Sequence, residues 1–169
     1  PKSHGCVVLA LAYDDLEISV GAGMDIERDP RLAGHQAAQQ ALRQFPGKTR
    51  SGLLLFGDGL LPTYGEVLRG IQEVLGTSFL VEGGLMADDL RFDQTFQYLQ
   101  DSALTRAVVG LLLGGSCTLG VGVEHGFAPI SKPWHVTRAK ANILYELEGR
   151  PASSMYEEYF GTQGLALIQ

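Results

Sequence analysis

Cysteine is scarce in this chain. Only two occur, Cys6 and Cys117, which lie far apart in the sequence and in apolar surroundings. Neither a disulfide framework nor a cysteine-based zinc site is expected from this usage. A reducing compartment suits such a chain, and the cytoplasm is the predicted location.

An excess of basic residues is also missing. The chain has 13 Lys and Arg against 19 Asp and Glu, a formal net charge of −6, and its basic residues are dispersed. Affinity for nucleic acid comes largely from clustered Lys and Arg side chains that neutralise phosphates. DNA and RNA are therefore not expected as partners.

Long apolar runs are missing as well. The longest, Val108 to Leu113, is far shorter than the roughly 20 residues that a membrane-spanning helix needs. No signal peptide pattern opens the chain. We therefore expect a soluble protein without a membrane partner.

What is present is the composition of a folded domain. The chain has 169 residues, of which 45% are hydrophobic, and 22 glycines, enough to build a core without disulfides or metals. We expect one α/β domain over residues 1–161, with 162–169 as a tail or the start of a following element. Because Pro1 leads almost at once into an apolar run, we expect a segment trimmed from a longer protein.

The first half of the chain alternates strand and helix patterns. Asp29-Pro30 is typical of a helix start, and the spacing from Thr63 to Glu66 is that of a capping box. Small residues on the first helix indicate close packing on a sheet. The predicted elements are a hairpin of Cys6–Ala12 and Glu17–Ala22, a helix from Pro30 to Phe45, a strand at Gly52–Gly57, a helix from Thr63 to Gly76 and a strand at Ser78–Val81.

The second half has strand patterns without helices between them, which favours antiparallel pairing. The predicted elements are strands at Thr95–Leu99, Ala107–Leu113, Thr118–Val123 and His135–Leu147, interrupted near Lys140, and a short helix opened by Pro151. The predicted fold class is mixed α/β. A strand-helix-strand-helix-strand unit is followed by antiparallel strands, with helices packed on a mixed sheet.

The common cofactor and metal motifs are not matched. Gly47-Lys48-Thr49 resembles the end of a P-loop, but Leu42 occupies the position of the first glycine and the triplet follows a helix. Both Gly-x-Gly pairs lack the third glycine of a dinucleotide fingerprint. The four histidines include no pair at metal-ligand spacing. No cofactor and no metal are expected.

An enzyme is the alternative hypothesis. Cys117 and His125 could form a thiolate and its base in a hydrolase or transferase, yet no cation adjoins Cys117 in the sequence, and a core cysteine is favoured. Asp88-Asp89, with Asp93 close behind, could act as paired carboxylates or bind Mg²⁺, although a solvated turn is favoured. Because no complete catalytic motif is found, no catalytic residue is assigned.

Several segments, in order, resemble one family. They are Ser19–Gly23 with Asp29-Pro30, Leu53–Gly59, Glu82-Gly83-Gly84 with Asp88-Asp89, Val123–Pro129, His135–Ala139, and Asn142 through Tyr145–Ala152 to Tyr156. In this order and spacing they resemble the N-terminal half of a FIST domain. The resemblance implies an intracellular sensory module of signal-transduction proteins, for which small ligands such as amino acids are proposed. It also implies a C-terminal FIST half and a signalling output domain as partners.

Candidate ligand-binding residues follow from where α/β sheets receive ligands, which is at strand ends, where backbone groups are free. Thr137 and Arg138 could offer a hydroxyl and a cation to a carboxylate-bearing ligand. The candidates are Asp58, Gly59, Gly83, Gly84, Asp88, His125, Gly126, Thr137 and Arg138. A turn-forming or structural function stays open for each of them. A further hypothesis is a scaffold half that binds no ligand and docks the C-terminal half.

Overall fold

A computed structural model describes Ala10 and residues 14–161. The chain divides into two compact units, an amino-terminal unit within residues 1–121 and a carboxy-terminal unit within residues 122–169. Each unit is described by itself below.

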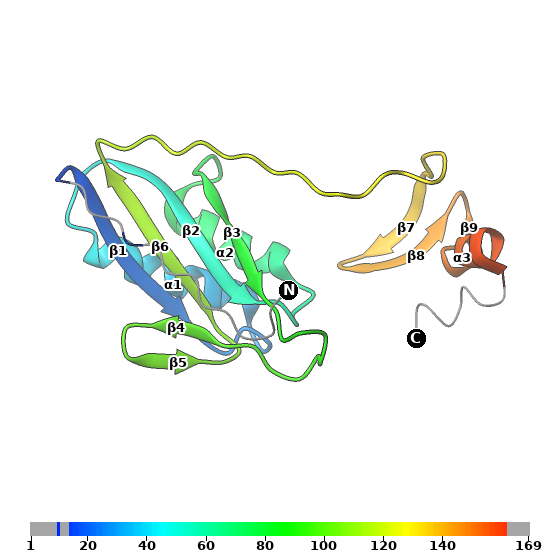
Figure 1. Cartoon of the computed structure of the whole chain (residues 1–169), viewed down its shortest axis with the longest axis horizontal. Helices are drawn as coiled ribbons and strands as arrows, with labels where there is room; N and C mark the ends of the chain where they lie inside the picture. Colours follow the sequence, from blue (N-terminus) through cyan, green and yellow to red (C-terminus); the bar gives the residue numbers. More distant parts are fainter. Residues whose placement is uncertain (1–9, 11–13, 162–169) are drawn as a thin grey trace. The chain divides into compact units, whose positions relative to one another are not determined.

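The amino-terminal unit is built on a four-stranded mixed sheet with the strand order β1-β6-β2-β3. Its strands are β1 (Leu16–Gly23), β2 (Arg50–Asp58), β3 (Val81–Met86) and β6 (Val108–Gly115). β2 and β3 are parallel, whereas β6 is antiparallel to both β1 and β2. β1, β2 and β3 therefore run in the same direction, and their carboxyl ends meet at the edge where β6 begins (Figure 1).

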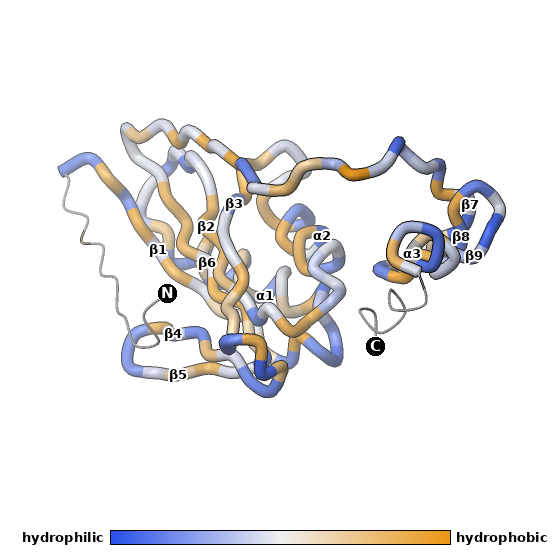
Figure 2. Tube along the Cα trace, turned by 45° about the vertical axis from the view of Figure 1, so that its right-hand side comes forward, coloured by the Kyte–Doolittle hydropathy of each residue, from blue (hydrophilic) through white to orange (hydrophobic). Residues whose placement is uncertain are grey.

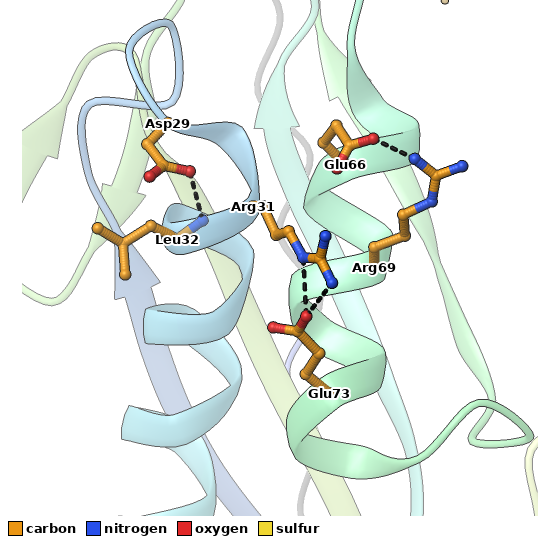
Figure 3. A network of polar contacts seen from close by, with 6 residues as sticks. All are labelled: Asp29, Arg31, Leu32, Glu66, Arg69 and Glu73. Carbon is orange, nitrogen blue, oxygen red and sulfur yellow. Dashed lines mark hydrogen bonds and ion pairs between the residues drawn. The ribbon is translucent and has the colours of Figure 1, made fainter.

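Two helices, α1 (Pro30–Gln44) and α2 (Tyr64–Leu75), link β1 to β2 and β2 to β3. The predicted start of α1 is confirmed, because the Asp29 side chain accepts a hydrogen bond of 2.9 Å from the Leu32 backbone N–H. The helices contact each other along their lengths. Arg31 of α1 pairs with Glu73 of α2 across their exposed surface (Figure 3), although exposed pairs of this kind contribute little to stability.

The core lies between the two helices and the sheet. The predicted close packing of α1 on a sheet is confirmed, because a Cβ on Gly23 of β1 would lie 1.9 Å from the Ala33 carbonyl oxygen of α1. The buried cluster consists of Ile26, Ala33, Ala37, Ala38, Ala41, Leu53, Leu55, Val67, Ile71, Leu75, Val108 and Leu112. The strands that supply it carry hydrophobic residues at 53–56 in the middle of β2 and over most of 108–113 in β6 (Figure 2).

A small hairpin of β4 (Gln97–Leu99) and β5 (Ser102–Leu104) precedes β6. β4 contacts both β2 and β6. The turn of the hairpin is hydrophilic (Figure 2). Sequence patterns had predicted the first of these strands and missed the second, which is only three residues long.

The carboxy-terminal unit contains β7 (Val136–Lys140), β8 (Ile143–Leu147), β9 (Arg150–Pro151) and α3 (Ser153–Phe160). The three strands form one antiparallel sheet with the order β7-β8-β9. The predicted interruption near Lys140 is confirmed as the turn between β7 and β8. The mixed α/β class, with antiparallel strands after the strand-helix alternation, is also confirmed.

Two predicted strands were placed wrongly. The third strand begins at Val81 instead of Ser78, because residues 77–79 form a turn, closed by a 3.2 Å hydrogen bond from the Phe79 N–H to the Gly76 carbonyl. Thr118–Val123 is not a strand. None of the strand pairings in the described part of the chain includes this segment, and a Cβ at Gly120 or Gly122 would meet no atom within 4 Å.

One predicted helix cap and one predicted helix start differ from the structure, whereas one predicted hairpin stays untested. Thr63 precedes α2, but its side chain makes no capping hydrogen bond, and the first-turn contact is from the Glu66 N–H to its carbonyl. Pro151 pairs within β9, so α3 starts at Ser153. The partner strand predicted at residues 6–12 lies outside the described residues, apart from Ala10.

Candidate functional site

The carboxyl edge of the parallel strands holds a polar cavity. Its volume is about 300 Å³. Its walls come from the segments that follow β1, β2 and β3 and the one that precedes β6. They are formed by Glu27, Asp58, Leu60, Asp93, Gln94, Thr105 and Arg106, and we call this space the edge cavity. Crevices outside the carboxyl ends of strands are where α/β sheets usually bind ligands.

Asp58, predicted as a ligand residue, is the buried carboxylate of the edge cavity. Asp58 is 5% exposed. The Oδ1 atom accepts a 2.9 Å hydrogen bond from the Leu60 backbone N–H, and the Asp58 carbonyl accepts one of 2.8 Å from the Tyr64 hydroxyl. The first bond holds the side chain, and the second holds the backbone, at the end of β2. Burial, and secondly the charge of Asp58, raise the pKa of Tyr64, so its hydroxyl stays a donor.

Arg106 supplies the guanidinium of the edge cavity and pairs with Glu27, with 3.7 Å between Nε and Oε2. The Arg106 backbone carbonyl accepts a 3.1 Å hydrogen bond from the Ile26 N–H, which ties the segment after β1 to the start of β6. The pair therefore joins the walls contributed by these two segments.

Asp88 organises the loop that follows β3. Its carboxylate accepts hydrogen bonds from the backbone N–H groups of Phe92 (3.1 Å), Asp93 (2.7 Å) and Gln94 (3.3 Å). These bonds, the one from Asp93 first, lower the pKa of Asp88. Asp88 does not line the edge cavity, but the loop that it holds carries Asp93 and Gln94 into its wall. It lines a separate, wider cavity of about 640 Å³ beside the same loop.

Replacing Asp88 with asparagine is expected to remove an acid-dependent part of the stability. A carboxyl group whose folded-state pKa is lowered stabilises the fold above its unfolded pKa and loses this contribution as pH falls through the folded value. Urea unfolding at neutral pH should therefore find the variant less stable than the wild type, and the difference should shrink below about pH 4, the ordinary pKa of an aspartate. A difference that is constant with pH would contradict this assignment.

The predicted glycines have different environments. Gly59 lies at the carboxyl edge, where its N–H donates a 3.0 Å hydrogen bond to the Met86 carbonyl. Gly83 and Gly84 lie inside β3, not at its end. A Cβ on Gly83 would be 1.8 Å from the Leu55 carbonyl oxygen, so this glycine permits the close approach of β3 to β2. Gly84 faces open space.

The four candidates of the carboxy-terminal unit each have a local contact or open surroundings. Arg138 pairs with Glu146, with 2.9 Å between Nε and Oε1. The Thr137 hydroxyl accepts a 3.0 Å bond from the Gly149 N–H, and Nδ1 of His125 accepts one of 3.3 Å from the Phe127 N–H. A Cβ on Gly126 would meet no atom within 4 Å. None of the four lines the apolar cavity of this unit, which is formed by Ile130, Ser131, Trp134, Met155, Tyr159 and Phe160.

The residues of the enzyme hypothesis belong to different units. Cys117 lies in the amino-terminal unit, half-buried, where its thiol donates a 3.4 Å hydrogen bond to the Gly114 carbonyl. His125 lies in the carboxy-terminal unit. In the part of the chain that the structure describes, no group of three or more His, Cys, Asp or Glu residues is placed to hold a metal ion. None of the described helices is long and apolar enough to cross a membrane.

Sequence reasoning missed most of the edge cavity. Glu27, Gln94, Thr105 and Arg106 were not among its candidates, and Asp93 was noted only as a neighbour of Asp88. Each of them lies within a few residues of a strand or hairpin boundary. Asp58 was predicted because polar residues just after a strand can bind ligands. The same rule would have found Glu27 if it had been known that β1 and β2 run in the same direction and end at the same edge of the sheet.

Sequence comparison relates the chain to a protein family and to a longer relative. The sequence model of the FIST N domain family matches residues 2–150. An uncharacterized protein of Methanocaldococcus jannaschii is 27% identical over 156 residues, which are 89% of this chain and 30% of that protein. The chain thus spans less than a third of the length of this relative. No solved structure matches the chain.

Proposed function

Because this chain belongs to the FIST N domain family, we propose that it is a cytoplasmic sensory module that binds a small ligand in signal transduction. The ligand site of this proposal is the edge cavity. A C-terminal FIST half and a signalling output domain are the proposed partners, and no catalytic step is assigned to the chain.

The observation that carries this proposal is the convergence of four segments on one polar cavity. Its walls follow three parallel strands and precede a fourth, antiparallel strand. A ligand seated there would contact all four segments at once, and its binding would couple loops that are far apart in the sequence. Such coupling is what a sensor needs, because a ligand changes a protein only through contacts that differ between states.

A thermal-shift screen of the 169-residue chain tests the proposal. The screen should contain amino acids, small carboxylates, short amines and nucleotides. A ligand present at a hundred times its Kd stabilises the folded state by about 2.7 kcal/mol, which corresponds to a rise in Tm of roughly 5–10 °C for a chain of this size. Heteronuclear NMR with each hit should then move the amide signals of Leu60, Gln94 and Arg106.

The control for the screen is the variant Thr105→Arg. Its long cationic side chain is expected to fill the edge cavity from the segment before β6. A hit that binds there should lose its shift in this variant, provided that the variant keeps the circular dichroism of the wild type. If no compound of the screen raises the Tm or moves an amide signal, the sensor proposal is contradicted.

A further inference from the structure

We propose that the edge cavity selects a small organic cation, such as a short aliphatic amine or a guanidinium compound, which Asp58 and Asp93 bind through its charged group. This inference rests on the proposed function and names the class of ligand. It differs from the carboxylate-bearing ligand that Thr137 and Arg138 had suggested.

The charge of the cavity is the first argument. Its lining contains the carboxylates of Glu27, Asp58 and Asp93 and a single guanidinium, that of Arg106, so the lining carries a formal net charge of −2 (−3 + 1). Arg106 is already paired with Glu27. Among the described residues, neither Asp58 nor Asp93 forms an ion pair. The cavity therefore attracts a cation and repels a carboxylate.

The burial of Asp58 is the second and independent argument. The residue is only 5% exposed, and a buried carboxylate is costly unless it is paired and hydrogen-bonded. Only Oδ1 has a hydrogen-bond partner among the described residues, the Leu60 N–H. Because no fully buried side-chain oxygen or nitrogen of the described residues lacks a partner, the unpartnered Oδ2 atom is accessible, and Asp58 lines the edge cavity. An ammonium or guanidinium group there would supply both the missing charge and the missing donors.

The remaining wall fits the rest of such a ligand. Leu60 offers an apolar contact for methylene groups, whereas Gln94 and Thr105 offer neutral groups that can donate or accept. The volume of about 300 Å³ is at the lower end of small-molecule sites. The cavity therefore suits a short molecule with a cationic end, because the only cation in its lining is Arg106, which Glu27 already engages.

Isothermal titration of the 169-residue chain with three probes of similar length tests this inference. Putrescine carries two amines, ornithine adds a carboxylate to the same skeleton, and glutarate carries two carboxylates and no amine. Putrescine is expected to bind most tightly and glutarate not to bind. Tightest binding of glutarate, or equal binding of all three, would overturn the inference.

The variants Asp58→Asn and Asp93→Asn assign the binding to the cavity. An asparagine at position 58 keeps an oxygen that can accept from the Leu60 N–H, so the local turn survives while the charge is lost. Each variant is expected to weaken putrescine binding at least about tenfold, as loss of a charge-assisted hydrogen bond does. The matched control is Asp101→Asn, because Asp101 is exposed in the β4–β5 turn and does not line the cavity. It should bind putrescine like the wild type.

The outcomes separate this inference from the proposed function. Equal binding by Asp58→Asn, Asp93→Asn and Asp101→Asn overturns the cation site. If amines do not bind but another compound of the screen raises the Tm, the sensor proposal stands and the cation inference is wrong. Circular dichroism of each variant checks its fold, and if Asp58→Asn does not fold, Asp93→Asn, whose exposed side chain forms no ion pair among the described residues, decides the matter.

Discussion

Replacing Gly70 with alanine is expected to destabilise the amino-terminal unit by about 2–3 kcal/mol, although alanine is the better helix former. A Cβ at Gly70 of α2 would lie 1.9 Å from the Arg31 carbonyl oxygen of α1 and 2.8 Å from the His35 nitrogen. Both are backbone atoms, which cannot rotate away. The contact is reciprocal, since a Cβ on Gly34 of α1 would lie 2.1 Å from the Val67 carbonyl oxygen. The helices would have to move apart and disturb the core beneath them.

Gly65→Ala is the matched control, because it makes the same change in the same helix. A Cβ at Gly65 would meet no atom within 4 Å. The control should be neutral or gain up to about 1 kcal/mol from the reduced freedom of the unfolded chain. Urea unfolding followed by circular dichroism measures both variants. Equal effects of the two substitutions would mean that the close approach of α1 and α2 does not limit the size of residue 70.

The sequence predicts those parts of the fold that depend on neighbouring residues. Asp29-Pro30 and Gly76 mark helix boundaries because capping and a positive φ are local requirements; the Asp29 cap is observed, and Gly76 has φ +101°, although its ψ of 152° is not that of a left-handed helical residue. The insertion of β6 between β1 and β2 could not be predicted. The hydrophobic pattern of Val108–Leu113 predicts that this strand is buried, but it does not predict which strands lie beside it. The pairing of segments that are distant in the sequence depends on the packing of the whole unit.

The same division holds for the candidate site. Asp58 was predicted because a polar residue directly after a buried strand is a local pattern, and the structure places it in the edge cavity. Arg106 and Thr105 could not be found in this way, because they come before an antiparallel strand whose position depends on the sheet order. Gly83 misled the strand prediction for a physical reason. A glycine that permits close strand packing has the same sequence appearance as one that ends a strand.

Gln97 illustrates a buried polar residue that no sequence pattern indicated. It is 1% exposed, and its Oε1 accepts a 3.3 Å hydrogen bond from the Ala107 N–H, just before β6. Its Nε2 donates a 3.0 Å bond to the hydroxyl of Thr95, which is 2% exposed. The side chain thus connects β4 to the segment that carries Thr105 and Arg106, and it holds one wall of the edge cavity in place.

Replacing Gln97 with leucine is expected to cost about 2–3 kcal/mol of unfolding free energy, because the buried Ala107 N–H loses its acceptor and leucine offers no other. Gln36→Leu is the matched control, since Gln36 is exposed on α1, and its effect should stay within about 0.5 kcal/mol. A double-mutant cycle with Thr95→Val isolates the side-chain pair, whose coupling should be of the order of 1 kcal/mol.

If Gln97→Leu is no more damaging than Gln36→Leu, the hydrogen bond to Ala107 does not anchor the start of β6. If the fold survives but ligand hits of the thermal-shift screen are lost, Gln97 acts on the cavity by positioning the segment before β6.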